Sequence, residues 1–297
     1  MHTLSYVSGT SDAPLLGETI GENLRRTVER FPDHEAAVIA HQSWRCTYRE
    51  LWEQSGTLGR ALMARGIEKG DRVGMWAPNR FEWVVAQYAT ARIGAIMVNV
   101  NPAYRAHELE YALKQSGMKL LLMAQNFRAT NYVEIFESIK DNCPELKGHV
   151  VLDTGYESLL SEAERVSDED LAKRERTLSF DDAINIQYTS GTTGLPKGAT
   201  LSHHNILNNG YFIARKMNYN EADRVCVPVP FYHCFGMVIG NLACTSTGAC
   251  IVVPNEFFDA ETTMEIIQGE RCTSIYGVPT MFIAQLNHPR FEEFDFT

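Results

Sequence analysis

The ten residues from 189 to 198 combine side chains that could bind a polyphosphate. In order they are Thr189, Ser190, Gly191, Thr192, Thr193, Gly194, Leu195, Pro196, Lys197 and Gly198. Glycine permits the backbone turns that direct successive N–H groups into one concavity. Hydroxyl groups supply further donors, and a lysine adds a full positive charge. The segment therefore has the composition that a phosphate-binding loop requires.

An ordinary surface loop is the simplest alternative, because clusters of Gly and Thr between periodic segments usually form loops. An ordinary loop, however, has no need of a Pro-Lys-Gly sequence shortly before a helix. The segment also differs from the P-loop G-x-x-x-x-G-K-[ST], because Lys197 follows a proline and precedes a glycine. The dinucleotide fingerprint G-x-G-x-x-G is absent from the sequence. We therefore expect a phosphate loop of another class.

Residues 189–198 resemble, without a gap, the signature of the adenylate-forming superfamily. Its members include acyl-CoA synthetases, luciferases and the adenylation domains of peptide synthetases. Further segments resemble the family at 47–51, 69–73, 94–102, 231–236 and 276–280. In character the sequence is similar to medium- and long-chain fatty acyl-CoA synthetases, which are AMP-forming acid–thiol ligases of fatty acid metabolism.

The resemblance implies how the parent protein would activate a small carboxylic acid. A carboxylate is a poor electrophile, so it is first transferred onto the α-phosphorus of ATP with loss of pyrophosphate. The thiol of coenzyme A then attacks the acyl-adenylate. The first step needs mainly positioning and charge neutralisation. By resemblance, residues Thr189 to Lys197 contact ATP, and ATP, Mg²⁺ and coenzyme A are the co-substrates of the parent enzyme.

His233 is the candidate catalytic residue. It follows an apolar segment, 227–232, that contains two prolines. In such surroundings a histidine is more often a packed core residue than a functional one. In the family, however, the aromatic-His element flanks the substrate carboxylate and the adenylate. The resemblance also assigns His233, Gly236, Gly277 and Val278 to the substrate pocket, with ordinary packing as the alternative for each.

Composition excludes several classes of protein. With 27 basic and 37 acidic residues the net charge is −10, which gives no basic footprint for nucleic acid. The N-terminus lacks the pattern of a signal peptide, and no apolar stretch is long enough to cross a bilayer. The seven cysteines include no C-x-x-C pair, so neither a zinc site nor a disulfide framework is expected. We therefore expect a cytoplasmic protein with free thiols.

Strands and helices alternate along the chain, which predicts an α/β fold of largely parallel sheets flanked by helices. We expect two stacked subdomains, 1–180 and 181–297, with a solvated connector at 153–182 that holds one short helix. A Thr47/Glu50 capping box predicts the start of one helix. The phosphate loop is expected between a strand at 183–188 and a helix from 204, at the carboxyl end of the strand. The N-terminus of that helix could add a favourable dipole; the alternative is that a helix starting several residues beyond Lys197 is too distant to do so. His203 and His204 are expected to be structural.

Several family elements are missing from the sequence. It contains no aromatic-Gly-x-Thr-Glu motif, whose glutamate binds magnesium in the family, so no metal ligand is assigned. The ribose-binding aspartate and the small C-terminal domain with its catalytic lysine are also not found. We therefore expect the truncated N-terminal portion of a ligase, inactive by itself, with uncovered surfaces that favour self-association. The alternatives are a non-catalytic nucleotide-binding module, or an adenylating enzyme for aryl or amino acids.

Overall fold

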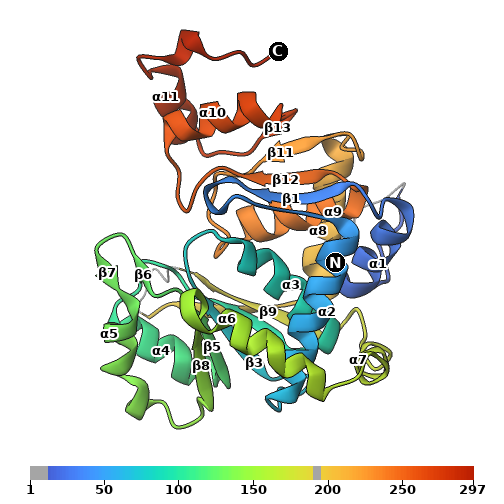
Figure 1. Cartoon of the computed structure of the whole chain (residues 1–297), viewed down its shortest axis with the longest axis vertical. Coiled ribbons are helices and arrows are strands. Elements are labelled where there is room, and N and C mark those ends of the chain that lie inside the picture. Colours follow the sequence, from blue (N-terminus) through green and yellow to red (C-terminus); the bar gives the residue numbers. More distant parts are fainter. Residues whose placement is uncertain (1–12, 190–194) are drawn as a thin grey trace, which may run out of the picture.

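Two largely parallel sheets carry the described part of the chain, residues 13–189 and 195–297 of the computed structural model (Figure 1). The six-stranded sheet has the order β10-β9-β4-β3-β5-β8, and the five-stranded sheet has the order β13-β11-β12-β1-β2. The strands are β1 (Glu35–Ile39), β2 (Trp44–Thr47), β3 (Arg72–Trp76), β4 (Ile96–Asn99), β5 (Leu120–Met123), β8 (Gly148–Val151), β9 (Ala183–Thr189), β10 (Lys197–Ser202), β11 (Arg224–Cys226), β12 (Cys250–Val253) and β13 (Ser274–Ile275), with the short pair β6 (Asn126–Phe127) and β7 (Thr130–Asn131).

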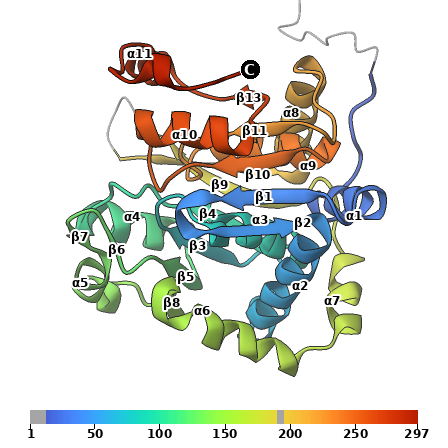
Figure 2. The same cartoon turned by 45° about the horizontal axis from the view of Figure 1, so that its top comes forward.

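Helices connect these strands and cover the sheets (Figures 1 and 2). They are α1 (Ile20–Arg30), α2 (Tyr48–Ala64), α3 (Phe81–Ile93), α4 (Ala106–Ser116), α5 (Tyr132–Glu137), α6 (Leu152–Ser161), α7 (Asp168–Glu175), α8 (His203–Lys216), the π-helix η4 (Phe235–Leu242), α9 (Ala243–Thr247), α10 (Ala260–Glu270) and α11 (Pro279–Leu286). The expected α/β fold is confirmed.

Each sheet has a parallel interior and one antiparallel edge strand. In the six-stranded sheet β10 is antiparallel to β9, and in the five-stranded sheet β2 is antiparallel to β1. All four residues of β5 and of β12 are buried, as expected for parallel strands with helices on both faces. Between the sheets, every residue of α3 from 82 to 93 is buried. The core therefore consists of helices held between two sheets.

The expected division after residue 180 cuts across both sheets. Strand β9, which follows residue 180, pairs with β4 from the first part of the chain, and β10 extends the sheet by pairing with β9. Conversely, the early strand β1 pairs with β12 in the register Ala37↔Ile251. Such pairings join residues far apart in sequence, and local hydrophobic periodicity carries no information about them.

The start of α2 lies where the local sequence predicts it. The capping box at α2 is present: the Glu50 N–H donates to Thr47 Oγ1 at 3.2 Å, and the Thr47 N–H donates to Glu50 Oε2 at 2.7 Å. Strands β1 and β2 form an antiparallel hairpin, with Ser43 at φ = 50° in the connection. Sequence alone was sufficient where the determinant is local.

The expected connector at 153–182 is wrong in its helix content. Two helices, α6 and α7, occupy most of it, with a 3₁₀ turn between them. Leu152, Tyr156 and Leu159 are buried and share one face of α6 at helical spacing. In α7 only Leu171 is buried, and Ser167 caps the helix by accepting the Asp170 N–H. The many charged residues concealed this narrow apolar stripe.

His203 is buried in the interior rather than placed at a binding surface. Its ring has 0% exposure, and Nδ1 accepts a hydrogen bond from the Ile20 N–H at 3.2 Å. Nε2 has no hydrogen-bond partner among the described residues. Burial lowers the pKa of His203 to about 4, so the ring stays neutral at pH 7. The expectation of a structural histidine is confirmed.

This burial predicts acid sensitivity. An unfolded chain has a histidine pKa near 6.5, so between pH 6.5 and 4 the unfolded state binds the additional proton. The stabilisation by neutral His203 is therefore complete above about pH 6.5 and is lost as the pH falls toward 4. Between pH 7.5 and 4.5 we expect the free energy of unfolding to fall by about 2 kcal/mol less in His203→Gln than in the original chain. Urea unfolding at the two pH values measures this difference. His204→Gln is the matched control at the neighbouring, less buried position. Equal pH slopes for all three proteins would refute the prediction.

Candidate functional site

The predicted site residues lie at the carboxyl ends of strands from both sheets. Thr189 is the last residue of β9. His233 follows β11 after the segment 227–232, and Gly277 follows β13. The carboxyl ends of parallel strands form the usual binding edge of open α/β sheets, so the topology gathers residues that are widely separated in sequence.

The two ends of the predicted phosphate loop are paired with each other. Lys197 opposes Thr189 in the β9–β10 ladder, and Thr189 Oγ1 donates to the Lys197 carbonyl at 3.4 Å. The Lys197 side chain is exposed, and no carboxylate in 13–189 or 195–297 forms an ion pair with it. Leu195 and Pro196 precede it, with Leu195 49% exposed. The predicted residues Ser190, Gly191, Thr192, Thr193 and Gly194 lie outside the described part of the chain.

The expected strand–loop–helix arrangement is wrong, because β10 intervenes before the helix. β10 begins at Lys197 and ends at Ser202, so α8 starts six positions after Lys197, at His203. At about 3.3 Å per residue this separation is about 20 Å, so the dipole of α8 acts at the other end of β10. The residues of β10 show no apolar alternation and are mostly exposed. Pairing with β9, not a local pattern, defines this strand.

His233 is exposed and held in one orientation. Its Nδ1 accepts the Phe235 N–H at 3.1 Å, and its carbonyl accepts the N–H groups of Gly236 and Met237 at 3.1 and 3.2 Å. In the neutral ring the proton then resides on Nε2, which can donate to a ligand. These contacts begin the π-helix η4, a rare geometry that is frequent at functional sites.

Two glycines allow η4 to lie directly on the segment before it. A Cβ on Gly236 would lie 2.6 Å from the carbonyl oxygen of Pro230, and one on Gly240 would lie 2.9 Å from Val227 Cγ1. The first contact is with backbone, which cannot move away as a flexible side chain would. Gly236 is therefore required for the shape of the His233 turn.

A ring contact brings the end of β13 to the His233 turn. The rings of Tyr276 and Phe235 are 5.6 Å apart between centroids, and Gly277 and Val278 follow Tyr276 directly. A Cβ on Gly277 would lie 3.0 Å from Phe282 Cζ in α11. Val278 is 39% exposed. The residues expected to bind substrate thus form one neighbourhood.

Two asparagines that sequence reasoning missed hold the segment before His233. Asn79 Oδ1 accepts the Phe231 N–H at 2.7 Å, and its Nδ2 donates to the Val229 carbonyl at 3.0 Å. Asn99 Nδ2 donates to the Tyr232 carbonyl at 3.3 Å. Both asparagines are buried, with 2% and 1% exposure. The available signal was a polar residue at or just beyond the end of a buried strand.

A pocket of about 230 Å³ adjoins this segment. Its walls come from the segments after β3, β4, β11 and β12, from the β6–β7 pair and from α11. They include Asn79, Asn101, Arg128, Pro230, Tyr232, Glu256, Phe257 and Met281. The Arg128 guanidinium lies 4.3 Å from the centre of the Phe257 ring. Burial raises the pKa of Glu256. The pocket therefore combines aromatic surface with one cation beside the His233 turn.

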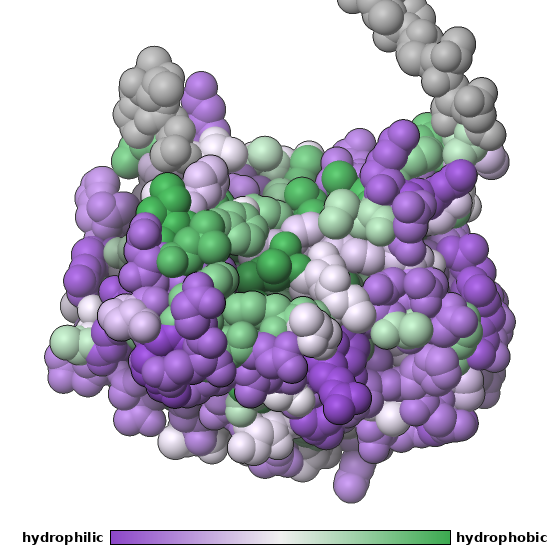
Figure 3. Space-filling model, turned by 90° about the horizontal axis from the view of Figure 1, so that it is seen from above, coloured by the Kyte–Doolittle hydropathy of each residue, from purple (hydrophilic) through white to green (hydrophobic). Residues whose placement is uncertain are grey.

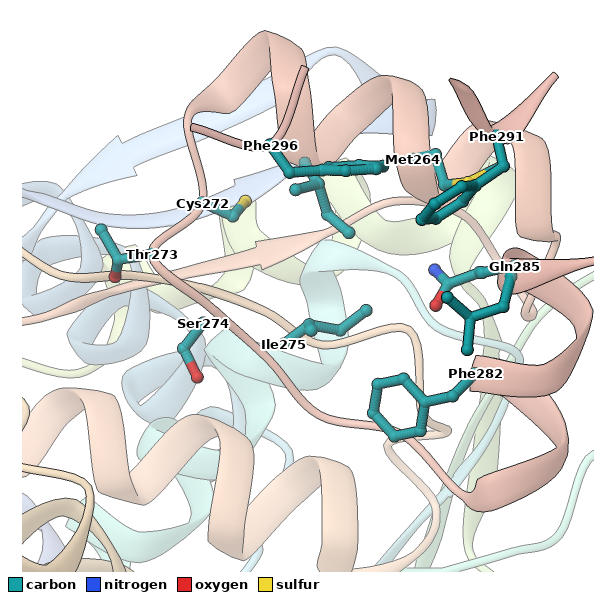
Figure 4. Close-up of a pocket in the computed structure, with 11 residues that line it drawn as sticks. Met264, Cys272, Thr273, Ser274, Ile275, Phe282, Gln285, Phe291 and Phe296 are labelled. Atoms are coloured by element: carbon teal, nitrogen blue, oxygen red, sulfur yellow. The ribbon is translucent and has the colours of Figure 1, made fainter. Parts of the chain in front are cut away.

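A second pocket, of about 300 Å³, lies beside β13 and contains none of the predicted site residues. Figure 4 shows aromatic and aliphatic side chains from α10, α11 and the following segment around it, with the Gln285 amide directed inward. Figure 3 shows apolar side chains gathered around a hollow on this end of the molecule. Exposed Val278, Ile283, Leu286 and Phe296 belong to this part of the chain. Self-association through it stays a prediction.

The described residues do not form a metal centre. In 13–189 and 195–297, no group of three or more His, Cys, Asp or Glu side chains is placed to hold an ion. A search of the same residues finds no helix with the length and apolarity needed to span a membrane.

Known proteins resemble this chain in sequence and in fold. The family described as AMP-binding enzyme matches residues 24–296. The chain is 41% identical over 303 residues to the putative acyl-CoA synthetase YngI of Bacillus subtilis (strain 168). This alignment covers 95% of this chain and 55% of YngI. The chain is 38% identical over 317 residues to the mitochondrial medium-chain acyl-CoA ligase ACSF2 of Danio rerio, covering 99% and 52%. The inhibitor-bound N-terminal domain of FACL13 from Mycobacterium tuberculosis has a TM-score of 0.76 at 25% identity, covering 94% and 67%.

The chain belongs to the AMP-binding enzyme family, since the match extends over most of its length. The predicted resemblance to adenylate-forming enzymes is confirmed. The relatives of the chain are acyl-CoA synthetases and ligases. The chain spans about half the length of the curated relatives it matches.

The close approach at Gly236 gives a test of the site's architecture. We expect Gly236→Ala to lower the free energy of unfolding by about 2 kcal/mol, because the methyl group meets the Pro230 carbonyl. Gly269→Ala is the control, since Gly269 lies in α10 with no heavy atom within 4 Å of an added Cβ. That change should gain up to about 1 kcal/mol from helix propensity. Urea unfolding measures both, and a neutral Gly236→Ala would show that the turn is not held as described.

Proposed function

We propose that this chain forms the ATP- and acid-binding part of a fatty acid–CoA ligase that proceeds through an acyl-adenylate. One arrangement supports the proposal most directly. Lys197, an exposed cation without a carboxylate partner among the described residues, ends a glycine- and hydroxyl-rich segment. His233 lies on a turn whose preceding residues bond to Asn99 of β4, the strand that neighbours β9.

Each candidate residue has a distinct part in the proposed reaction. A carboxylate oxygen attacks the α-phosphorus of ATP, and pyrophosphate leaves with the electrons of the broken P–O bond. The Lys197 ammonium would offset charge on the departing phosphates. The His233 Nε2–H would donate to an oxygen of the carboxylate or the adenylate and hold it in line. In the second step a thiol sulfur attacks the acyl carbon, and AMP leaves.

The acid and its acceptor are proposed from the relatives. A medium-chain acyl-CoA ligase among them favours a fatty acid as substrate and coenzyme A as acceptor, with Mg²⁺ accompanying ATP in the parent enzyme. Adenylation by the full-length protein, measured across fatty, aryl and amino acids, separates this proposal from other adenylating enzymes. Absence of adenylation with every acid would favour a non-catalytic nucleotide-binding module. A cytoplasmic location stays a prediction.

The role of Lys197 predicts a change in nucleotide affinity. We expect Lys197→Ala to weaken ATP binding by about 10- to 100-fold in calorimetric titration, because one charge-assisted contact with phosphate is lost. Lys216→Ala, which removes an exposed cation at the end of α8, is the control and should leave the affinity unchanged. Equal affinities of the two variants would contradict the proposed contact.

The missing family motif predicts that the 297 residues alone are not competent. The sequence contains no aromatic-Gly-x-Thr-Glu motif, and the described residues form no metal centre. We therefore expect no acid-dependent exchange of labelled pyrophosphate into ATP by this chain, with ATP binding retained. Exchange above the acid-free control would show that the chain carries the complete chemistry.

A further inference from the structure

Three buried amide side chains lie together on neighbouring strands beneath the candidate site. Asn185 and Gln187 alternate along β9 and therefore face the same side of the sheet. Asn99 ends the adjacent strand β4 and pairs with Gln187 in the parallel register. Exposure is 1% for Asn99, 1% for Asn185 and 6% for Gln187. Polar groups buried this deeply require partners.

The three amides bond to one another in a single direction. Gln187 Nε2 donates to Asn185 Oδ1 at 2.8 Å, and Asn185 Nδ2 donates to Asn99 Oδ1 at 3.0 Å. Asn99 Nδ2 then donates to the main-chain carbonyls of Tyr232 at 3.3 Å and Phe231 at 3.4 Å. Asn185 and Asn99 each accept a hydrogen bond from the preceding amide and donate one onward, so the bonds polarise one another favourably.

This amide chain, Gln187–Asn185–Asn99, connects the two halves of the candidate site. It begins two residues before Thr189, the last described residue before the glycine-rich segment. It ends on the carbonyl of Tyr232, which directly precedes His233. Met237, in the first turn of η4, places its Sδ 2.8 Å from Asn99 Nδ2 and 3.7 Å from Gln187 Nε2. The start of η4 therefore rests on the same amides.

We propose that Gln187, Asn185 and Asn99 are positioning residues that keep the His233 turn in register with the strand leading to Lys197. Apolar side chains would fill this interior without a desolvation cost, whereas the bonded amide chain favours the one arrangement of the two segments that keeps its donors and acceptors paired. None of the three belongs to the residues proposed to touch the substrates. They act through Tyr232 and Thr189. The use of ATP and an acyl-adenylate mimic as probes rests on the proposed function.

Asn99→Leu tests this role, because it removes both the donor to Tyr232 and the acceptor from Asn185 at similar side-chain volume. The probes are ATP and decanoyl-sulfamoyl-adenosine, a stable mimic of an acyl-adenylate that would have to engage both halves of the site. With the full 297-residue chain we expect the mimic to bind about tenfold more weakly, and ATP to bind within about twofold of the original affinity. Calorimetry measures both.

Asn208→Leu is the matched control. Asn208 is also buried, at 6% exposure, and its amide bonds to Leu16 and to the His204 carbonyl. It should lose stability to a similar degree without changing either affinity. If both variants lost affinity for the mimic equally, the amide chain would only stabilise the fold in general, and the proposal would be overturned. If Asn99→Leu does not fold, Gln187→Leu removes only the first bond and must show a smaller loss in the same direction.

A spectroscopic readout separates failure of this proposal from failure of the proposed function. If the original chain binds neither probe, the proposed function fails while the positioning role can still be judged. The ¹H–¹³C signals of the His233 ring should then shift in Asn99→Leu and stay unchanged in Asn208→Leu. Unchanged His233 signals in a folded Asn99→Leu variant would overturn the positioning role whatever the ligands do.

Discussion

Hydrogen bonds from two asparagine side chains to one stretch of main chain are the interaction on which the candidate site depends. Asn79 and Asn99 come from the ends of β3 and β4, and the stretch they bond, 229–232, follows β11 of the other sheet. Buried main-chain groups must be paired, and this stretch has no strand neighbour of its own among the sheet pairings of the described residues. The asparagines therefore complete its bonding and join the carboxyl ends of both sheets.

Close packing of the turn that follows this stretch fixes the orientation of the exposed His233 imidazole. The Gly236 backbone lies against Pro230, so η4 starts immediately after the bonded stretch and directs the His233 carbonyl into its first turn. Phe235 then meets Tyr276 at the end of β13. The Lys197 cation, the His233 ring and the wall at Gly277 thus come from β10 and from the segments that follow β11 and β13, which are three different strands. An adenylating reaction needs mainly such placement, because its first step depends on charge neutralisation and alignment.

Sequence reasoning was accurate where a local cause exists and failed where the cause lies elsewhere in the chain. The Thr47/Glu50 capping box and the alternation of strands and helices were readable in advance, and His203 was correctly taken as structural. Strand β10 was missed, since its exposed residues show no apolar alternation and it forms by pairing with β9. The second helix of 153–182 was missed because a single buried residue, Leu171, anchors a highly charged segment.

By itself, the sequence determined the family, the alternation of strands and helices, and which residue types are available for phosphate and carboxylate binding, because these depend on composition and short-range spacing. Only the tertiary structure decided which strands are neighbours, and hence that Asn99, Asn185 and Gln187 meet beneath the His233 turn. The physical reason is that a buried amide is satisfied by whichever group the fold places beside it. For Asn99 that group is a carbonyl 133 residues further along the chain.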